Sequence, residues 1–287
     1  MRYTGNYPVY YSLIMQEKNM KKALCMVTVL CVAALMFAGG ASDSGEDNSL
    51  VKIKNSGVFV LGLDDSFPPM GFRDENNEIV GYDIDLAREV TARMGVTLKL
   101  QPIDWNAKEQ ELNTGNIDCI WNGFTITPER AKMINFTKPY LKNAQVLVVR
   151  ADSPVRGLKD LKGKDVGLQA GSSASNALED ATAFRASLKN VIEFKDNLMA
   201  LMDLEASGVD AVVMDLMVAN DNINRSGKAY RILAEDLAAE EYGIGFRKKD
   251  SALRNEVQRI LEEMAADGTV AEISKKWFGA DISIIGK

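Results

Sequence analysis

The stretch IDCIWNGFTITPERAKMINFTKPY, residues 117–140, decides the fold and raises the question of function. Four of its first five residues, 117–121, are apolar, and the run predicts a short buried strand. Thr127 and Pro128 then predict the N-cap and the first residue of a helix. Helix starts favour negative charge, because their free N–H groups carry a partial positive charge, so Arg130 stands at the unfavourable end. Its position indicates that an anion binds nearby.

Composition narrows the class of protein. The chain has 287 residues, 46% apolar and 26% charged, which is typical of a globular protein with a well-buried core. It contains no histidine, which excludes histidine-activated nucleophiles and every metal site that needs a histidine ligand. Most hydrolase classes are therefore excluded, and we expect no cofactor, no metal site and no catalytic residue.

The N-terminal forty residues are typical of an export signal. In MKKALCMVTVLCVAALMFAGGAS, which begins at Met20, two lysines precede an apolar run and then small residues. The run is shorter than the roughly 20 residues of a membrane-spanning helix, and Gly40 stands where a lipid-anchored protein would carry cysteine. We predict a signal peptide over 1–40, with residues 1–19 a misread start, and a polar linker over 41–55. The expected location is the periplasm.

Removal of this signal leaves an acidic protein. The whole chain has 34 Lys and Arg against 40 Asp and Glu. Residues 1–40 contain four of the basic and one of the acidic residues, so 30 and 39 remain and the net charge is −9. Nucleic acids and anionic membranes bind basic patches, so neither is an expected partner. Cys119 is the one cysteine left, which excludes an internal disulfide and predicts a core residue in its apolar run.

Apolar runs and helical patterns alternate after the linker, which predicts an α/β architecture. Strands are expected over 58–63, 96–102, 117–121 and 145–152, and a short helix over 106–115. Another helix is expected over 81–95, because four apolar residues recur on one face: Ile84, Ala87, Val90 and Met94. The pattern restarts at LKGKDVGLQAGSSASNALEDA, so the simplest layout has two lobes, with the chain crossing over and later returning.

Seven motifs stand in order along the chain: GLDDSFPPMGF, GYDIDLAREV, IDCIWNGFTITPER, FTKPY, LKGKDVGLQAGSSA, GVDAVVMD and MAADGTVAEISKKWFG. Together they resemble the amino-acid-binding periplasmic proteins of ABC importers, the group of family 3 solute-binding proteins specific for histidine, lysine/arginine or glutamine. The resemblance implies a type II periplasmic-binding-protein fold, in which two α/β lobes joined by two crossing strands close on a free amino acid. It would place 56–145 plus 240–287 in the first lobe, and 146–239, with the hinge strands, in the second.

The resemblance also implies how the two charges of an amino acid are held. Arg130 would offer a planar pair of donors to the carboxylate, helped by the Gly123 N–H and the Thr125 hydroxyl. Ser172 would reach the same carboxylate from the other lobe, and Asp215, at the end of a strand, would pair with the α-ammonium. From the pattern alone simpler roles stay open, because Arg130 could pair with a nearby acid, and Ser172 and Asp215 could cap helices.

A second set of residues would contact the ligand's side chain. The resemblance places Asp64 there, with Phe67 and Trp105 on either side of the ligand's side chain. A basic ligand would gain a cation–π interaction with these rings. Asp65 adds a second carboxylate, so a polar or cationic side chain is favoured over an aliphatic one. Two amide side chains line the cleft: Asn122 and Gln169. Trp121 replaces a small or aliphatic residue, and it could be core, as could Trp105, while Asp64 and Phe67 could merely shape a turn.

We therefore predict a monomeric receptor that captures a free polar or cationic L-amino acid and delivers it to the membrane permease of an ABC importer. One alternative is an enzyme of the same fold, such as a dehydratase of cyclic carboxylic acids. Another is a sensor that reports ligand to a signalling partner. The pairing of Arg130 with Asp215 favours the receptor, because it matches both charges of an amino acid.

Overall fold

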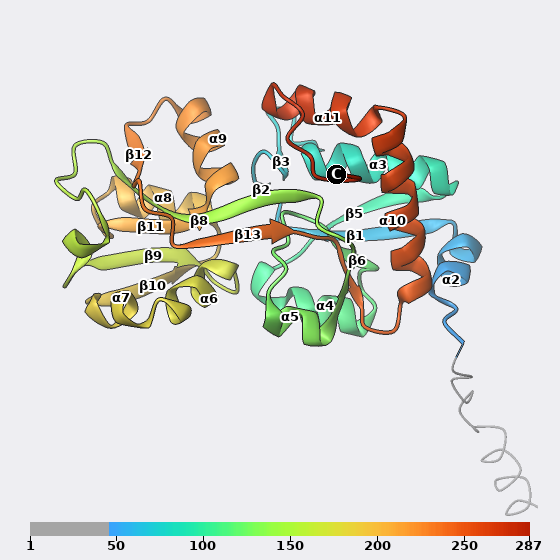
Figure 1. The fold of residues 1–287 in the computed structure, drawn as a ribbon, viewed down its shortest axis with the longest axis horizontal. Helices are drawn as coiled ribbons and strands as arrows, with labels where there is room; N and C mark the ends of the chain where they lie inside the picture. Colours follow the sequence, from blue (N-terminus) through green and yellow to red (C-terminus); the bar gives the residue numbers. More distant parts are fainter. Residues whose placement is uncertain (1–45) are drawn as a thin grey trace, which may run out of the picture. The chain divides into compact units, whose positions relative to one another are not determined.

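The computed structural model describes residues 46–287, which form two large β-sheets connected by a pair of strands (Figure 1). The first sheet has the order β5-β1-β6-β14-β7. Its strands are β1 Val58–Leu63, β5 Thr97–Pro102, β6 Cys119–Ile120, β7 Ile134–Phe136 and β14 Gly245–Arg247. β1 runs parallel to β5 and β6, whereas β14 is antiparallel to its neighbours. The predicted strand over 58–63 is confirmed, and the strand predicted over 117–121 is shorter than expected.

The second sheet has the order β10-β9-β11-β8-β12, with β13 also paired to β8. Its strands are β8 Leu141–Arg150, β9 Asp165–Gln169, β10 Asn190–Phe194, β11 Ala211–Asp215, β12 Tyr230–Ile232 and β13 Ala238–Tyr242. A small third sheet joins β2 Ser66–Phe67, β3 Gly71–Arg73 and β4 Ile79–Val80. The α/β class and the two-sheet arrangement follow the prediction.

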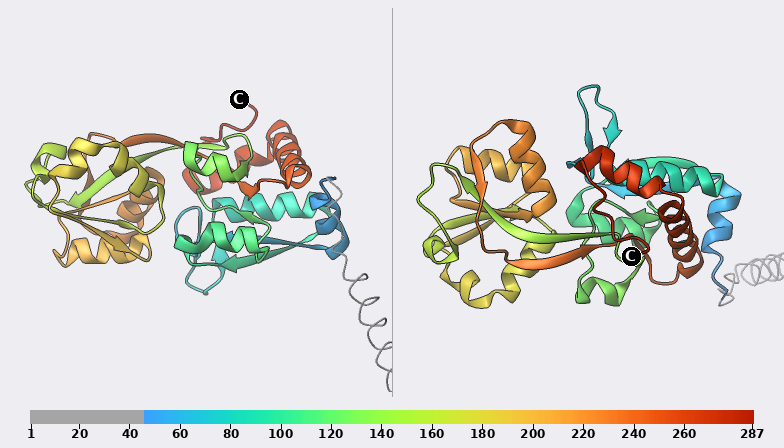
Figure 2. Two further views of the ribbon diagram at one scale, coloured as in Figure 1. Left: turned by 90° about the horizontal axis from the view of Figure 1, so that it is seen from below. Right: turned by 45° about the horizontal axis from the view of Figure 1, so that its top comes forward.

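Strands β8 and β13 carry the chain from one large sheet to the other and back (Figures 1 and 2). They pair antiparallel, from Leu141 opposite Tyr242 to Gln145 opposite Ala238. The predicted lobe boundaries, 145/146 and 239/240, fall inside these two strands. The predicted signal peptide lies outside the described residues.

Helices cover the faces of both large sheets (Figure 1). Those that belong with the first sheet are α2 Ser49–Ser56, α3 Tyr82–Met94, η1 Trp105–Ala107, α4 Lys108–Thr114, α5 Pro128–Met133, α10 Ser251–Ala266 and α11 Thr269–Phe278. Those of the second are η2 Leu158–Leu161, α6 Ser173–Asp180, α7 Thr182–Ser187, α8 Asn197–Glu205 and α9 Leu216–Ser226. Within residues 46–287, none of the helices is apolar over a length that could cross a bilayer.

The apolar positions predicted for the core are buried. The face predicted on α3 is at most 3% exposed, and Cys119 and Trp121 are fully buried, so all three core assignments are confirmed. The predicted cap is confirmed too: the Thr127 hydroxyl accepts from the Arg130 N–H, and Pro128 begins α5.

Helix α2 corrects the prediction of a linker over 41–55. Its sequence, SLVKIKNS, has one apolar residue that becomes buried, Ile53. The helix packs on α10, where the Ser49 hydroxyl accepts from the Leu253 N–H at 3.1 Å. Because tertiary packing supplies most of the stability of short helices, a pattern this weak does not reveal one from sequence alone.

Gly81 gives the clearest stability prediction of the fold. It precedes α3 at φ +146°, and a Cβ there would overlap the Met70 carbonyl oxygen. Gly81→Ala should lower the free energy of unfolding by about 3 kcal/mol or more, since both the backbone conformation and the overlap with rigid backbone are unfavourable. Urea unfolding measures this.

Gly95→Ala is the matched control. Gly95 also has positive φ, +71°, but nothing lies within 4 Å of the added Cβ. It should cost only about 1 kcal/mol. Equal losses in the two variants would contradict the steric explanation.

Candidate functional site

The predicted site residues gather where strands of the two large sheets end. Asp64 follows β1, Asn122 follows β6, and Gln169 and Asp215 end β9 and β11. This is the edge at which α/β sheets usually bind ligands. We call the residues around the first large sheet the first side of the site, and those around the second large sheet the second side. The two sides contact each other directly, since the Gln169 amide donates to Asp64 Oδ2 at 2.7 Å.

Arg130 lies at the boundary between the two sides. Its side chain is 10% exposed, and its guanidinium stacks on the Phe124 ring with a centroid distance of 4.7 Å. One nitrogen donates to the Thr125 carbonyl at 3.0 Å, and another donates across the boundary to the Gly171 carbonyl at 3.1 Å. Burial lowers the pKa of Arg130, but the ordinary pKa of a guanidinium is so high that the group stays cationic at neutral pH. Its hydrogen-bond acceptors here are neutral, so its charge is available to an anion.

Thr125 connects the first side to the second side and to the crossing strands. Its hydroxyl accepts from the Ser173 hydroxyl and donates to Glu240 Oε2, both at 3.1 Å. Ser173 begins α6, and Glu240 lies on β13. A hydroxyl with this pair of partners has its orientation determined by them.

Asp215 is the buried acid of the second side. Its Oδ1 accepts from the Tyr242 hydroxyl and from the Asn143 amide, both at 2.7 Å. Burial, and secondly the charge of Glu240, raise the pKa of Asp215 to about 7, while the Tyr242 hydrogen bond and Arg130 oppose this shift. Asp215 precedes α9 but makes no side-chain hydrogen bond to cap it, so the capping alternative receives no support.

Asp64 and its neighbours form the other end of the site. Burial raises the pKa of Asp64 to about 6, although the hydrogen bond from Gln169 opposes the shift. The Asn122 amide oxygen accepts from the Asp64 N–H at 3.1 Å, and the Asn122 amide nitrogen is buried without a partner. A pocket of about 290 Å³ opens here, lined by Asp64, Asp65, Ser66, Pro102, Ile103, Asp104, Trp105, Lys195 and Asp196.

The two predicted aromatic residues are both buried. Phe67 is 6% exposed and lies against Gly123, where an added Cβ would come within 2.7 Å of its ring. Trp105 is 8% exposed and meets Phe124 edge to face at 5.8 Å. Asp65 pairs with Arg73 at 2.6 Å, so the second predicted carboxylate already has a cationic partner.

Two of the predicted donors are engaged elsewhere. The Gly123 N–H donates to Asp83 Oδ2 at 2.7 Å, so the prediction of a free donor at this position is wrong. The Ser172 N–H and hydroxyl both donate to the Gln169 carbonyl, which closes the turn before α6. The next residue, Ser173, has its hydroxyl in the cleft instead. A one-residue shift in a turn changes which hydroxyl reaches Thr125, and the sequence QAGSSAS does not distinguish the two.

Four polar residues of the site were missed from the sequence. Asn143, Gln145 and Glu240 lie on the crossing strands, and Lys108 lies on α4. Lys108 is 2% exposed, and its ammonium donates to the Gly171 carbonyl at 2.7 Å, beside the bond from Arg130. Burial, followed by the charge of Arg130, lowers the pKa of Lys108 to about 8. The alternation of polar and apolar residues in LKNAQVLV was the available signal for Asn143 and Gln145.

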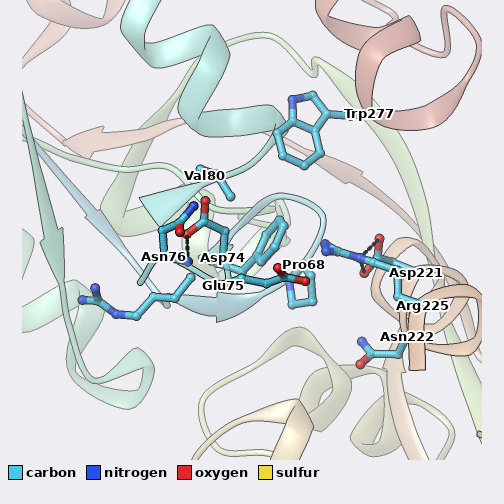
Figure 3. Close-up of a pocket in the computed structure, with 11 residues that line it drawn as sticks. Pro68, Asp74, Glu75, Asn76, Val80, Asp221, Asn222, Arg225 and Trp277 are labelled. Carbon is cyan, nitrogen blue, oxygen red and sulfur yellow. Dashed lines mark hydrogen bonds and ion pairs between the residues drawn. The ribbon is translucent and has the colours of Figure 1, made fainter. Parts of the chain in front are cut away.

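A larger pocket, about 620 Å³, lies apart from this cluster (Figure 3). Pro68, the turn at Asp74, Glu75 and Asn76, and Trp277 line it on one side, while Asp221, Asn222 and Arg225 from α9 line it on the other. None of the ten predicted site residues belongs to its lining. Arg225 pairs with Asp221 and stacks on Phe72, so its charge is already compensated.

Comparison with known proteins agrees with this geometry. Residues 59–280 match the family described as bacterial extracellular solute-binding proteins, family 3. The L-cystine-binding protein TcyJ of Escherichia coli strain K12 is 28% identical over 265 residues, covering 92% of this chain and 97% of TcyJ. The arginine-binding extracellular protein ArtP of Bacillus subtilis strain 168 is 30% identical over 264 residues, covering 90% of this chain and 98% of ArtP.

A solved structure extends the similarity to three dimensions. It is an ABC uptake transporter substrate-binding protein from Streptococcus pneumoniae with bound histidine. The two chains are 35% identical with a TM-score of 0.81, and the alignment covers 84% of this chain and all of the other. These three proteins are described as binding different amino acids.

Asp83, which orients the Gly123 turn, predicts a pH-dependent stability. Its carboxylate also accepts from the Tyr140 hydroxyl at 2.9 Å, and complete burial raises its pKa to about 7. The native state therefore keeps a proton that the unfolded chain, with an ordinary carboxyl, loses near pH 4. Hence the free energy of unfolding should fall as pH rises from 5 to 8, and Asp83→Asn should reduce this fall by about 2 kcal/mol.

Urea unfolding at pH 5 and pH 8, without added ligand, measures this difference. The amide introduced by Asp83→Asn would keep an acceptor for both hydrogen bonds but would not titrate. Asp236→Asn, at an exposed position, is the control and should keep the wild-type pH dependence. An Asp83→Asn protein with an unchanged pH dependence would contradict a buried, protonated Asp83.

Proposed function

Because the chain belongs to the bacterial extracellular solute-binding proteins of family 3, we propose that it binds a free polar or cationic L-amino acid between its two sheets and delivers it to an ABC importer. One observation supports the proposal most strongly. The Arg130 side chain is 10% exposed and Asp215 is buried, both are hydrogen-bonded to neutral groups, and the carboxylate in ion-pair range of Arg130, Glu109, is 4.0 Å away. An amino acid brings one charge of each sign. It would leave both groups paired.

Arg130 would bind the carboxylate of this ligand. A guanidinium presents two parallel N–H donors that match the two carboxylate oxygens. The N-terminus of α6, where Ser173 donates its hydroxyl to Thr125, would add backbone N–H donors. Asp215 would bind the α-ammonium. Its Oδ1 accepts the hydrogen bonds from Asn143 and Tyr242, so its Oδ2 could accept one from the ligand.

Asp64 would contact the ligand's side chain. It lines the 290 Å³ pocket together with two other acids, Asp104 and Asp196. The lining has one lysine, Lys195, so acidic residues outnumber basic ones. Trp105 lines the same pocket, and the Lys108 ammonium lies over its ring, 5.3 Å from the centroid. Phe67, Asn122 and Gln169 complete this end by supporting Asp64 and the turn at Gly123. An acidic pocket favours a cationic side chain, so arginine is the expected ligand.

Closure of the two lobes would be stabilised by hydrogen bonds between them that can form only when the lobes are close together. Arg130 and Lys108 of the first side reach the Gly171 carbonyl, and Gln169 reaches Asp64. A ligand that bridges the lobes would select this state from an open one. The two lobes would be 56–145 plus 240–287 and 146–239, with β8 and β13 as hinge. The exported, monomeric protein would then present its closed form to the membrane permease.

An enzyme of the same fold is the competing possibility. Asp64 and Asp215 have pKa values raised to about 6 and about 7, as a general acid requires. However, the two relatives and the solved structure described above are named as binding proteins. Incubation with cyclic carboxylic acids, followed by product analysis, would separate the two functions: conversion at a catalytic rate would favour the enzyme.

Stabilisation by ligand is the first test. We expect the ligand-stripped protein to unfold at a higher temperature with one or a few of the twenty amino acids, L-arginine among them. A ligand at a thousand times its Kd adds about 4 kcal/mol to stability, a shift of several degrees. No shift with any amino acid would contradict the proposed function.

Arg130→Ala should then abolish most of the binding. It removes the only cation proposed to meet the ligand's carboxylate, so Kd should rise by more than about a hundredfold, about 3 kcal/mol or more. Calorimetry measures this, and Lys132→Ala, at an exposed position of the same helix, is the control. Near wild-type affinity in Arg130→Ala would mean that the carboxylate binds elsewhere.

Asp64→Asn should change ligand preference instead. The variant should bind L-arginine about tenfold more weakly, as loss of one charge-assisted hydrogen bond predicts, and bind L-glutamine about as the wild type does. Asp65→Asn makes the same charge change at a carboxylate that is paired to Arg73, and it should have little effect. Equal losses for both ligands in Asp64→Asn would exclude a role in recognising the cationic side chain.

A further inference from the structure

Glu240 stands out among the residues of the cleft that no prediction used. It lies on β13, one of the crossing strands, directly opposite Asn143 of β8. Its Oε2 accepts three hydrogen bonds, from Thr125 Oγ1 at 3.1 Å, Asn143 Nδ2 at 3.1 Å and Gln145 Nε2 at 3.0 Å. Surface acids such as Asp267 pair with cations, whereas Glu240 is turned into the cleft.

Strand register brings Glu240 and Asp215 to one face of the second sheet. β8 has β11 on one side and β13 on the other. Asp215 of β11 lies opposite Gln145, and Glu240 of β13 lies opposite Asn143, two residues away on the same strand. Side chains two residues apart in a strand point to the same face, so all four converge.

A single amide connects the two acids. Asn143 Nδ2 donates to Asp215 Oδ1 at 2.7 Å and to Glu240 Oε2 at 3.1 Å. Beside them, Gln145 Oε1 is buried without a hydrogen-bond partner, and Gln145 is fully buried. Two carboxylates and an unpaired amide oxygen are therefore neighbours on one face of the sheet.

We propose that Glu240 contacts the ligand, receiving its α-ammonium together with Asp215, so that the hinge strand is part of the binding site. This rests on the proposed function. An ammonium group has three N–H donors, and Asp215, Glu240 and Gln145 Oε1 offer three acceptors for them. The cation would also compensate the repulsion between the two acids, adding to the effect of Arg130.

The charges around Asp215 make the proposal testable by pH. Arg130 faces it from α5, Glu240 and Tyr242 face it from β13, and the neutral amides of Asn143 and Gln145 face it from β8. Asp215 must lose its proton to bind an ammonium, and Glu240 contributes to its raised pKa. Affinity should therefore rise between pH 6 and 8, and removal of the Glu240 charge should move this rise to lower pH.

Calorimetry with two probes separates a ligand contact from a structural role. L-Arginine has the α-ammonium, and δ-guanidinovaleric acid is the same molecule without it. Glu240→Gln keeps the size of the side chain. It should weaken L-arginine at pH 8 by about tenfold or more and leave the affinity for δ-guanidinovaleric acid within about threefold.

Glu241→Gln is the matched control. Glu241 is the next residue of β13, it is exposed, and it points to the opposite face. It should leave the affinities for both probes and the pH profile unchanged. Thermal unfolding of the ligand-free variants checks that each one is folded.

Three results would overturn the proposal. Equal weakening of both probes in Glu240→Gln would assign Glu240 a structural role. Tighter binding of L-arginine would mean that Glu240 competes with the ligand's carboxylate for Thr125, and an unchanged pH profile would remove its link to Asp215. If another amino acid stabilises the wild type most, that amino acid and its des-amino analogue replace the two probes. If no amino acid stabilises the wild type, the proposed function itself fails. If the wild type binds an amino acid but Glu240→Gln behaves like Glu241→Gln, only the proposal for Glu240 fails.

Discussion

The cost of burying charge is the constraint on which the site depends. Arg130 and Asp215 are both removed from water, and each is hydrogen-bonded to neutral groups that orient it without neutralising it. An isolated buried charge is expensive, and a ligand with complementary charges offsets that cost. The same constraint favours a zwitterion over a simple acid or a simple amine, because each of those would leave one of the two groups unpaired.

The crossing strands do more than connect the sheets. β8 and β13 pair with each other, and Glu240 of β13 accepts hydrogen bonds from Asn143 and Gln145 of β8. Thr125 adds a link from the first sheet, since its hydroxyl donates to Glu240 and its backbone forms an isolated bridge with Tyr242.

Contacts across the cleft are concentrated on short turns. The Gly171 carbonyl accepts from both Lys108 and Arg130, and the neighbouring Gln169 donates to Asp64. Two cations at one carbonyl oxygen repel each other, and burial lowers the pKa of both. An anionic group near Arg130 would relieve that repulsion, so capture of a carboxylate and closure of the cleft favour each other physically.

Local signals were enough for much of the fold. The strand over 58–63, the buried face of α3 and the Thr127 cap all depend on residues near in sequence, and each was predicted correctly. Helix α2 was missed because its buried side rests on α10, which follows about two hundred residues later. Ten candidate site residues were predicted from the sequence, but their hydrogen-bond partners could not be, and the Gly123 N–H and the Ser172 hydroxyl are engaged elsewhere.

Those partners depend on register and turn geometry. Gln145 reaches Ser173 over 28 residues of chain, and Asn143 reaches Glu240 over 97. The sequence by itself therefore determined the elements, the class of fold and the charged residues available to a ligand, because periodicity and capping act within a few residues. Only the tertiary structure decided which donors are free, that Ser173 rather than Ser172 turns to the cleft, and that Glu240 faces Asp215, because strand pairing brings together residues that no local pattern connects.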